Sequence, residues 1–210
     1  ANTLGPIAEK ILGKSGVGLV QTALGESAYE KGEDRFRVLA YLTRGLNQSE
    51  NNGIAEITWV ATALRSKLAL CAGDMEYAQR LTSGMLQSLD PEHQPQLYEG
   101  VTAFSCWLSL YSNEIGRIRR WLETAPDETV EFCTLNRYFY MVKIYCYAAL
   151  GKHTDALMLI SRMMVYADYA QRTYIRLECG LLRAIVMRRT GSEWKEDFLQ
   201  VLSAISQYRF

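Results

Sequence analysis

Four glycines and one asparagine divide the sequence at intervals of about forty residues. They are Gly32, Gly73, Asn113, Gly151 and Gly191. The intervals are 41 residues (32 to 73), 40 (73 to 113), 38 (113 to 151) and 40 (151 to 191). Each of the five lies between two segments with helical periodicity, and a fixed period of this length is typical of stacked repeats. The sequence therefore predicts an all-α protein, a right-handed α-α superhelix of about five helical hairpins.

The segments around these five turn residues give the expected helices. The first helices of the hairpins should cover residues 18–31, 54–72, 96–112, 129–150 and 169–190, and the second helices should end near residues 48, 89, 124, 166 and 206. The connectors are short and polar, and all four prolines lie between helical segments. We therefore expect residues 17–210 to form a single repeat domain. Residues 1–16 should contain a short leading helix, the remnant of a preceding repeat.

Small side chains recur at fixed distances from the turn residues. The residues seven positions before them are Gly25, Ser66, Cys106, Ile144 and Ala184. The middle three repeats carry Ala78, Ile118 and Ala156 five positions after the turn. Small residues at such positions predict that two helices cross closely. The outer repeats have Arg37 and Glu196 there instead, and one inserted residue in the first repeat would bring Val38 into place.

Composition narrows the classes of function. The 210 residues are 49% hydrophobic and 22% charged, with a formal net charge of zero. A nucleic-acid-binding segment usually carries a basic excess, so we expect no direct nucleic-acid contact. No apolar run reaches the roughly 18 residues of a membrane span, so no membrane association is expected. The five cysteines show no CxxC spacing, which favours free thiols and a cytoplasmic protein.

Motifs that would carry chemistry are sparse. The stretch Gly13–Lys14–Ser15 resembles the end of a phosphate-binding loop, but Ala8 stands where that loop requires glycine. His93 and His153 have no histidine or cysteine partners at the spacing of metal ligands. No nucleophile stands out beside a base. We therefore expect no enzymatic activity, no catalytic residue, no metal and no cofactor.

Two stretches resemble the signature of the tetratricopeptide repeat. That signature is a helix pair with a turn glycine, a small residue seven positions before it and an alanine five positions after it. The sequences LGKHTDAL (150–157) and AGDMEYA (72–78) fit it closely. The usual tetratricopeptide period is about 34 residues, however, and here it is near forty.

The longer period resembles the repeat region of MalT-like, LuxR-family transcriptional regulators. Their LGE…KGE hairpin is similar to residues 24–33, their ARRWLE stretch to RIRRWLE (117–123), and their aromatic tail to Tyr208–Arg209–Phe210. The resemblance covers about residues 17–210. It implies a region that senses an inducer and self-associates, between a nucleotide-binding module and a helix-turn-helix.

A candidate ligand site follows from the expected superhelix, whose concave wall is lined by the first helices. Positions 13, 10, 6 and 3 residues before each turn should face this wall. The candidate contacts are Glu26, Tyr29, Lys67, Trp107, Tyr138, Tyr145, Glu178 and Arg188. Aromatic faces beside charged groups suit sugars, other small polar ligands and short peptides. The alternative is that Trp107, Tyr138 and Tyr145 only pack between helices.

These observations favour a ligand-sensing and oligomerisation domain of a bacterial LuxR-type regulator. Its partner would be a small-molecule effector or a protein, and self-association is expected. The alternative is a tetratricopeptide-type adaptor that binds a peptide or protein and has no transcriptional role. A third option is a structural spacer within a larger regulator.

Overall fold

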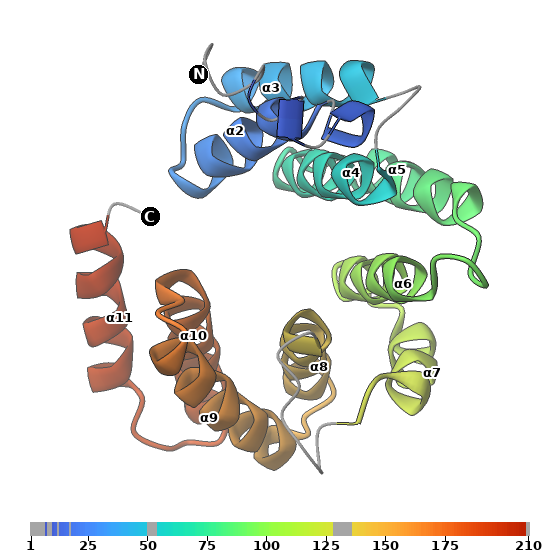
Figure 1. The fold of residues 1–210 in the computed structure, drawn as a ribbon. Helices are drawn as coiled ribbons and strands as arrows, with labels where there is room; N and C mark the ends of the chain where they lie inside the picture. Colours follow the sequence, from blue (N-terminus) through green and yellow to red (C-terminus); the bar gives the residue numbers. More distant parts are fainter. Residues whose placement is uncertain are drawn as a thin grey trace. The chain divides into compact units, whose positions relative to one another are not determined.

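The computed structural model describes residues 7, 10–11, 13–16, 18–49, 54–127 and 136–208. Within these ranges the chain forms ten α-helices, one short 3-10 helix and no β-strand (Figure 1). The elements are η1 (Gly13–Gly16), α2 (Leu19–Glu30), α3 (Arg35–Ser49), α4 (Ala55–Cys71), α5 (Met75–Ser88), α6 (Pro95–Ser109), α7 (Ile115–Thr124), α8 (Arg137–Ala149), α9 (His153–Tyr169), α10 (Thr173–Arg189) and α11 (Lys195–Tyr208). The prediction of an all-α protein is confirmed.

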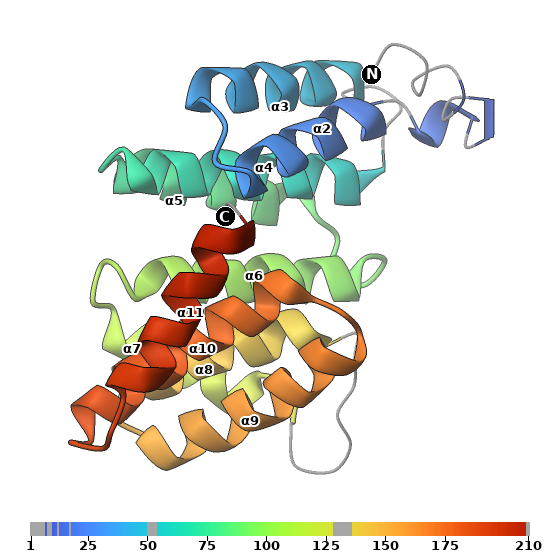
Figure 2. The same ribbon diagram turned by 90° about the vertical axis from the view of Figure 1, so that its left-hand side faces the viewer.

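The chain divides into two compact units, and each is described by itself. The first extends to Thr102 and the second runs from Ala103 to Arg209, so α6 contributes to both. In the first unit α2 packs on α3 and α4, α3 on α4, and α4 on α5 (Figure 1). In the second unit α9 packs on α8 and α10, α8 on α10, and α10 on α11 (Figure 2). Helices therefore pack on their neighbours in sequence, as in all-α repeat proteins.

The expected hairpin corners lie at the predicted residues. The backbone φ angle is positive at all five of them, between 57° at Asn113 and 81° at Gly73. At Gly73 the chain closes the helix with two backbone hydrogen bonds of 2.9 Å, from Gly73 to Leu70 and from Asp74 to Ala69. This is the Schellman arrangement, which needs a left-handed residue and therefore favours glycine. Asn113 substitutes for glycine because asparagine tolerates this conformation better than most residues.

The corner between α9 and α10 differs from the prediction, and α6 ends at Ser109, three residues before its expected end. The sequence pattern ended one helix at residue 166 and began the next at 169, whereas α9 continues to Tyr169 and α10 starts at Thr173. The chain turns at Gln171, with a φ of 56° and a 2.8 Å bond from Arg172 N–H to the Ala167 carbonyl. Glutamine gives no turn signal in a sequence. The expected helical segment 129–135 lies outside the described residues, as does most of the leading segment 1–16.

The compact apolar residues five positions after the turn lie in the core. Ala78, Ile118 and Ala156 are all completely buried. Val38 takes the equivalent place in the first repeat with 1% exposure, while Arg37 is exposed. A Cβ atom on Gly25 would lie only 2.6 Å from Cδ2 of Leu42, so α2 and α3 meet too closely there for any side chain.

The core of the second unit joins α8, α9 and α10, with α9 packed on both of the other helices. Tyr140 and Ile144 of α8, Ile160 and Met163 of α9 and Cys179 of α10 are fully buried in one cluster. Burial of apolar side chains at this density fixes the relative positions of α8 and α10.

None of the described helices is long and apolar enough to cross a membrane.

Candidate functional site

The eight candidate residues fall into two groups, one in each unit. The first unit contains Glu26 and Tyr29 on α2 and Lys67 on α4. The second contains Trp107 on α6, Tyr138 and Tyr145 on α8, and Glu178 and Arg188 on α10. The continuous inner wall expected from the sequence spans both units and stays a prediction.

The group in the first unit is a small charged patch. The ammonium of Lys67 lies 5.9 Å from the centre of the Tyr29 ring, which is within the range of a cation–π contact. Burial raises the pKa of the Glu26 carboxyl, the charge of Glu30 raises it further, and Lys67 acts in the opposite direction. These three candidates are therefore neighbours, and the only cation among them already lies over a ring.

The group in the second unit is centred on a hydrogen bond between two helices. The hydroxyl of Tyr145 on α8 donates to Oε1 of Glu178 on α10, at 2.7 Å. A phenol bound to a carboxylate is a charge-assisted pair, stronger than a bond between neutral groups. Tyr138 lies seven residues before Tyr145, which places both on the same face of α8. The structure thus brings together three candidate residues from different parts of the sequence.

More aromatic rings border this pair. Trp107 packs edge-on against Tyr111, with ring centres 5.0 Å apart, and lies 5.4 Å from Phe104. Tyr174 lies one helical turn before Glu178 on α10, so the two side chains share a face. We call Trp107, Tyr111, Tyr138, Tyr145, Tyr174 and Glu178 the aromatic–carboxylate site. Sequence reasoning missed Tyr111 and Tyr174, although each lies four residues from a candidate residue.

Burial and the charge of Glu178 together raise the pKa of three groups of the second unit. Burial raises the pKa of Tyr145, and the charge of Glu178 and its hydrogen bond raise it further, with smaller contributions from Tyr111 and Tyr174. Burial and the Glu178 charge also raise the pKa of Tyr138. The same two causes raise the pKa of the Cys179 thiol to about 12. The hydroxyls of Tyr138 and Tyr145 and the Cys179 thiol therefore stay protonated mainly because they are buried, and the charge of Glu178 adds to this effect.

The rings of the site are partly packed and partly accessible. Trp107 and Tyr145 lie against buried core clusters. Tyr111, Tyr174 and Tyr138 are 55%, 44% and 36% exposed. For Tyr138 this exposure refers to the whole residue, while the raised pKa concerns its hydroxyl. The site therefore combines rings held by the core with rings that solvent or a ligand can reach.

Arg188 lies apart from these contacts. Its guanidinium stacks over the Trp194 ring at 5.3 Å, just before α11 begins. The neighbouring Arg189 donates a 2.8 Å hydrogen bond to the carbonyl of Ala148, at the end of α8. Arg188 therefore packs against the start of the following helix, and it contributes no positive charge to the Tyr145–Glu178 pair.

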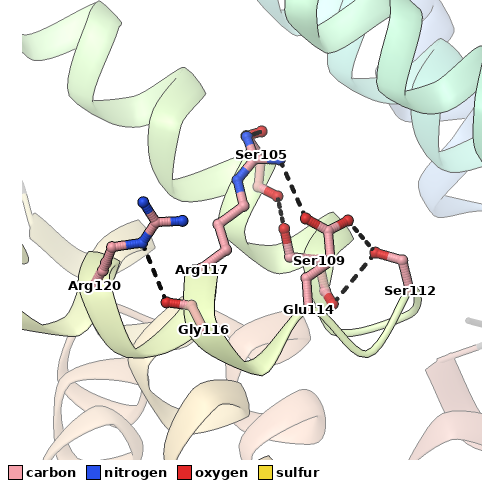
Figure 3. A network of polar contacts seen from close by, with 7 residues as sticks. All are labelled: Ser105, Ser109, Ser112, Glu114, Gly116, Arg117 and Arg120. Carbon is pink, nitrogen blue, oxygen red and sulfur yellow. Dashed lines mark hydrogen bonds and ion pairs between the residues drawn. The ribbon is translucent and has the colours of Figure 1, made fainter.

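A polar network fixes the corner that carries Tyr111. Arg117 on α7 donates a 2.6 Å hydrogen bond to the hydroxyl of Ser105 on α6 and pairs with Glu114 at 3.7 Å (Figure 3). Ser112 donates to the other oxygen of Glu114 at 2.6 Å, and Ser109 donates to the Ser105 carbonyl (Figure 3). Arg117 therefore braces α7 against α6, behind the turn that holds Tyr111.

A second candidate for ligand binding in the second unit is a hollow of 140 Å³ between α9, α10 and α11, where Arg183 pairs with Asp197 at 2.7 Å. Because its charges already pair with each other, it offers less than the aromatic–carboxylate site. No group of three or more histidine, cysteine, aspartate or glutamate side chains in the described ranges is arranged to hold a metal ion.

Comparisons with known proteins give no relative from which a role could be taken. No protein-family model matches the chain, and searches of curated proteins and of solved structures found no match.

Proposed function

We propose that this chain is a helical-repeat domain that senses a small polar effector, as do the repeat regions of the LuxR-type regulators its motifs resemble. The observation that carries the proposal is the Tyr145–Glu178 hydrogen bond, which joins two helices beside partly exposed rings. Aromatic faces supply contact area at low entropic cost, and a few fixed polar groups orient the ligand. The proposed role of these groups is to bind a ligand.

The proposed mechanism is a shift between two packings of the repeats. Tyr145 and Glu178 lie on the first helices of successive hairpins, so a ligand touching both favours the packing in which α8 and α10 are close. A ligand shifts such an equilibrium only by its difference in affinity for the two states. In the proposed regulator, the hairpins form one right-handed superhelix, and its change of curvature alters self-association and contacts with flanking modules.

Ligand-dependent thermal stability tests the proposal. The chain should be heated alone and with separate panels of neutral sugars, organic amines, carboxylates and nucleotides. We expect one panel to contain a compound that raises the melting temperature by at least about 5 °C at roughly a hundredfold excess over Kd. The substitution Tyr138→Ala should abolish the rise. Tyr169→Ala is the matched control, because Tyr169 is 88% exposed on α9 and lies outside the site.

The outcome separates sensing from the adaptor alternative. If the chain senses an effector, it should bind a small molecule. Tyr138→Ala should abolish this binding, whereas Tyr169→Ala should not. Specific capture of a peptide, without any small-molecule binding, would instead indicate a tetratricopeptide-type adaptor. Failure of every compound to change the melting temperature of a folded chain would contradict the sensing function.

A further inference from the structure

We infer that the aromatic–carboxylate site binds a ligand that carries an organic ammonium group. The inference rests on the proposed binding function and adds the chemical class of the ligand. It follows from the charge on Glu178, from the aromatic rings near that charge, and from the basic side chains that lie over other aromatic rings of the protein.

The first observation is the charge balance of Glu178. Its carboxylate accepts a hydrogen bond from the neutral Tyr145 hydroxyl, and no basic group in the described part of the chain forms an ion pair with it. Glu178 is half-buried, and a carboxylate removed from water is costly unless a positive charge compensates it. The four arginines of α10 are engaged elsewhere: Arg176 with Asp168, Arg183 with Asp197, Arg188 with the Trp194 ring and Arg189 with the Ala148 carbonyl. A positively charged ligand would supply the missing compensation.

The second observation is the accessible rings beside this charge. Aromatic faces attract cations through their negative quadrupole, and alkylated ammonium groups suit them best because such groups are weakly hydrated. Tyr111, Tyr138 and Tyr174 each expose at least 36% of their surface. The charge of Glu178 acts on the Tyr138 hydroxyl, and Tyr111 and Tyr174 both act on the hydroxyl of Tyr145, which Glu178 binds. A cation placed here would meet ring faces and a carboxylate together.

The third observation is that other rings of the protein already have a cation over them. Lys67 covers Tyr29 at 5.9 Å, Lys152 covers Tyr147 at 5.7 Å, and Arg188 covers Trp194 at 5.3 Å. For Tyr138 and Tyr145 the described residues provide no such basic side chain. The two rings whose hydroxyls respond to the charge of Glu178 are therefore not covered by a cation of the described chain, and Tyr138 is the more accessible of the two.

Other ligand classes fit these groups less well. An anion would be repelled by Glu178. A calcium or magnesium ion requires about six oxygen ligands, and the site provides one carboxylate among phenols. A neutral sugar could stack on the rings, but it would leave the charge of Glu178 uncompensated. An ammonium group on an alkyl frame uses both the rings and the carboxylate.

Choline and 3,3-dimethylbutan-1-ol provide the direct test, because they have the same shape and differ only in charge. Calorimetric titration of the complete 210-residue chain should show that choline binds at least about tenfold more tightly than the neutral alcohol. Glu178→Gln keeps an oxygen that can accept the Tyr145 hydrogen bond but removes the charge, and it should weaken choline binding at least about tenfold. Glu123→Gln, on the exposed side of α7, is the matched control and should leave binding unchanged.

A second arm identifies where the ammonium group comes from. A five-residue peptide with one trimethyllysine among glycines should be titrated beside choline. Tighter binding of choline supports a free small-molecule effector, and tighter binding of the peptide supports the same ammonium chemistry on a protein side chain. In both cases Glu178→Gln should remove the preference over the neutral alcohol.

The remaining outcomes separate this inference from the binding function. Equal affinity for choline and its neutral analogue, or choline binding that Glu178→Gln leaves unchanged, would overturn the ammonium inference. Binding of only a neutral or anionic compound would overturn it too, while the binding function would stand. Absence of binding by compounds of every charge class would overturn both.

Discussion

The Tyr145 hydroxyl donates a 2.7 Å hydrogen bond to Oε1 of Glu178, joining α8 to α10. The two residues are 33 positions apart in the sequence. Beneath them, Ile144 and Cys179 are fully buried in the core that the two helices share. The pair therefore lies beside the core that α8 and α10 share, where the hydrogen bond fixes the Tyr145 ring relative to the Glu178 carboxylate.

Removing the Tyr145 hydroxyl should weaken the second unit. In Tyr145→Phe the ring packing is kept, and the free energy of unfolding should fall by about 1.5 kcal/mol, the lower end of the range for a hydrogen bond to a charged group, because the pair is half-buried. Urea denaturation followed by circular dichroism measures the change. Tyr169→Phe should have no effect because that residue is 88% exposed. Equal stability of Tyr145→Phe and wild type would show that the bond contributes nothing.

The effect of the Tyr145–Glu178 pair on stability should also appear at alkaline pH. The folded protein raises the pKa of Tyr145 above its ordinary value of 10.0 through burial and Glu178, so the folded state keeps a proton that the unfolded state releases. Stability from this group is complete below pH 10 and declines as pH rises above it. Urea unfolding between pH 8 and 11 should show a steeper decline for wild type than for Tyr145→Phe. Parallel curves would contradict the raised pKa.

Two glycines within helices should respond to alanine in opposite directions. A Cβ atom on Gly45 of α3 would lie 2.4 Å from Oγ1 of Thr22 and 3.2 Å from the Gly18 carbonyl. Gly45→Ala should therefore destabilise the chain by about 1–3 kcal/mol, the usual cost of overpacking. Gly84 of α5 has no atom within 4 Å of the corresponding position. Gly84→Ala should stabilise by about 0.5–1 kcal/mol through helix propensity. Thermal melts of both variants measure these effects, and equal signs would contradict the close α2–α3 crossing.

The left-handed corners should prefer glycine. Asn113 has a φ of 57°, so Asn113→Gly should leave stability unchanged or raise it by up to about 1 kcal/mol. Gly151 has a φ of 74° and open space around it, so Gly151→Ala isolates the backbone strain. It should cost about 1 kcal/mol. If alanine at 151 were harmless in chemical denaturation, the corner there would not be left-handed.

The thiols should differ sharply in reactivity. Cys71 is exposed, whereas Cys106, Cys146 and Cys179 are buried. Burial and Glu178 also raise the pKa of Cys179 to about 12, so almost none of its reactive thiolate exists at pH 8. Iodoacetamide at pH 8 should alkylate Cys71 within minutes and the three buried thiols only after unfolding, as mapped by mass spectrometry. Rapid labelling of Cys179 in the native chain would contradict this packing.

Much of the fold could be predicted because its corners depend on a local backbone requirement. Glycine and asparagine adopt left-handed angles readily, so their positions revealed five corners in the sequence. Gln171 shows the limit of this signal, because it adopts the same conformation under the demands of packing between α9 and α10. The buried positions Ala78, Ile118 and Ala156 were predictable because compact apolar residues recur five positions after the turn in the middle three repeats.

The site could be predicted only in part. The sequence placed Tyr145 and Glu178 on one expected wall, but their hydrogen bond depends on how α8 and α10 pack. Tyr111 was missed because it lies just past the end of α6, outside the rule that assigned wall positions. Arg188 was assigned to the wall by spacing, yet Trp194 of the next connector provides a ring for its guanidinium. Such pairings depend on contacts between helices, which periodicity alone does not contain.

Hydrogen exchange with and without ligand tests the central claim most directly. The chain should be saturated with the tightest-binding compound of the panels, and the exchange of each peptide should be followed by mass spectrometry. The account predicts slower exchange in residues 137–149 of α8 and 173–182 of α10, and no such protection in the Tyr138→Ala variant. Protection confined to α11 and the hollow beside Arg183, or to the first unit, would contradict a site centred on Tyr145 and Glu178.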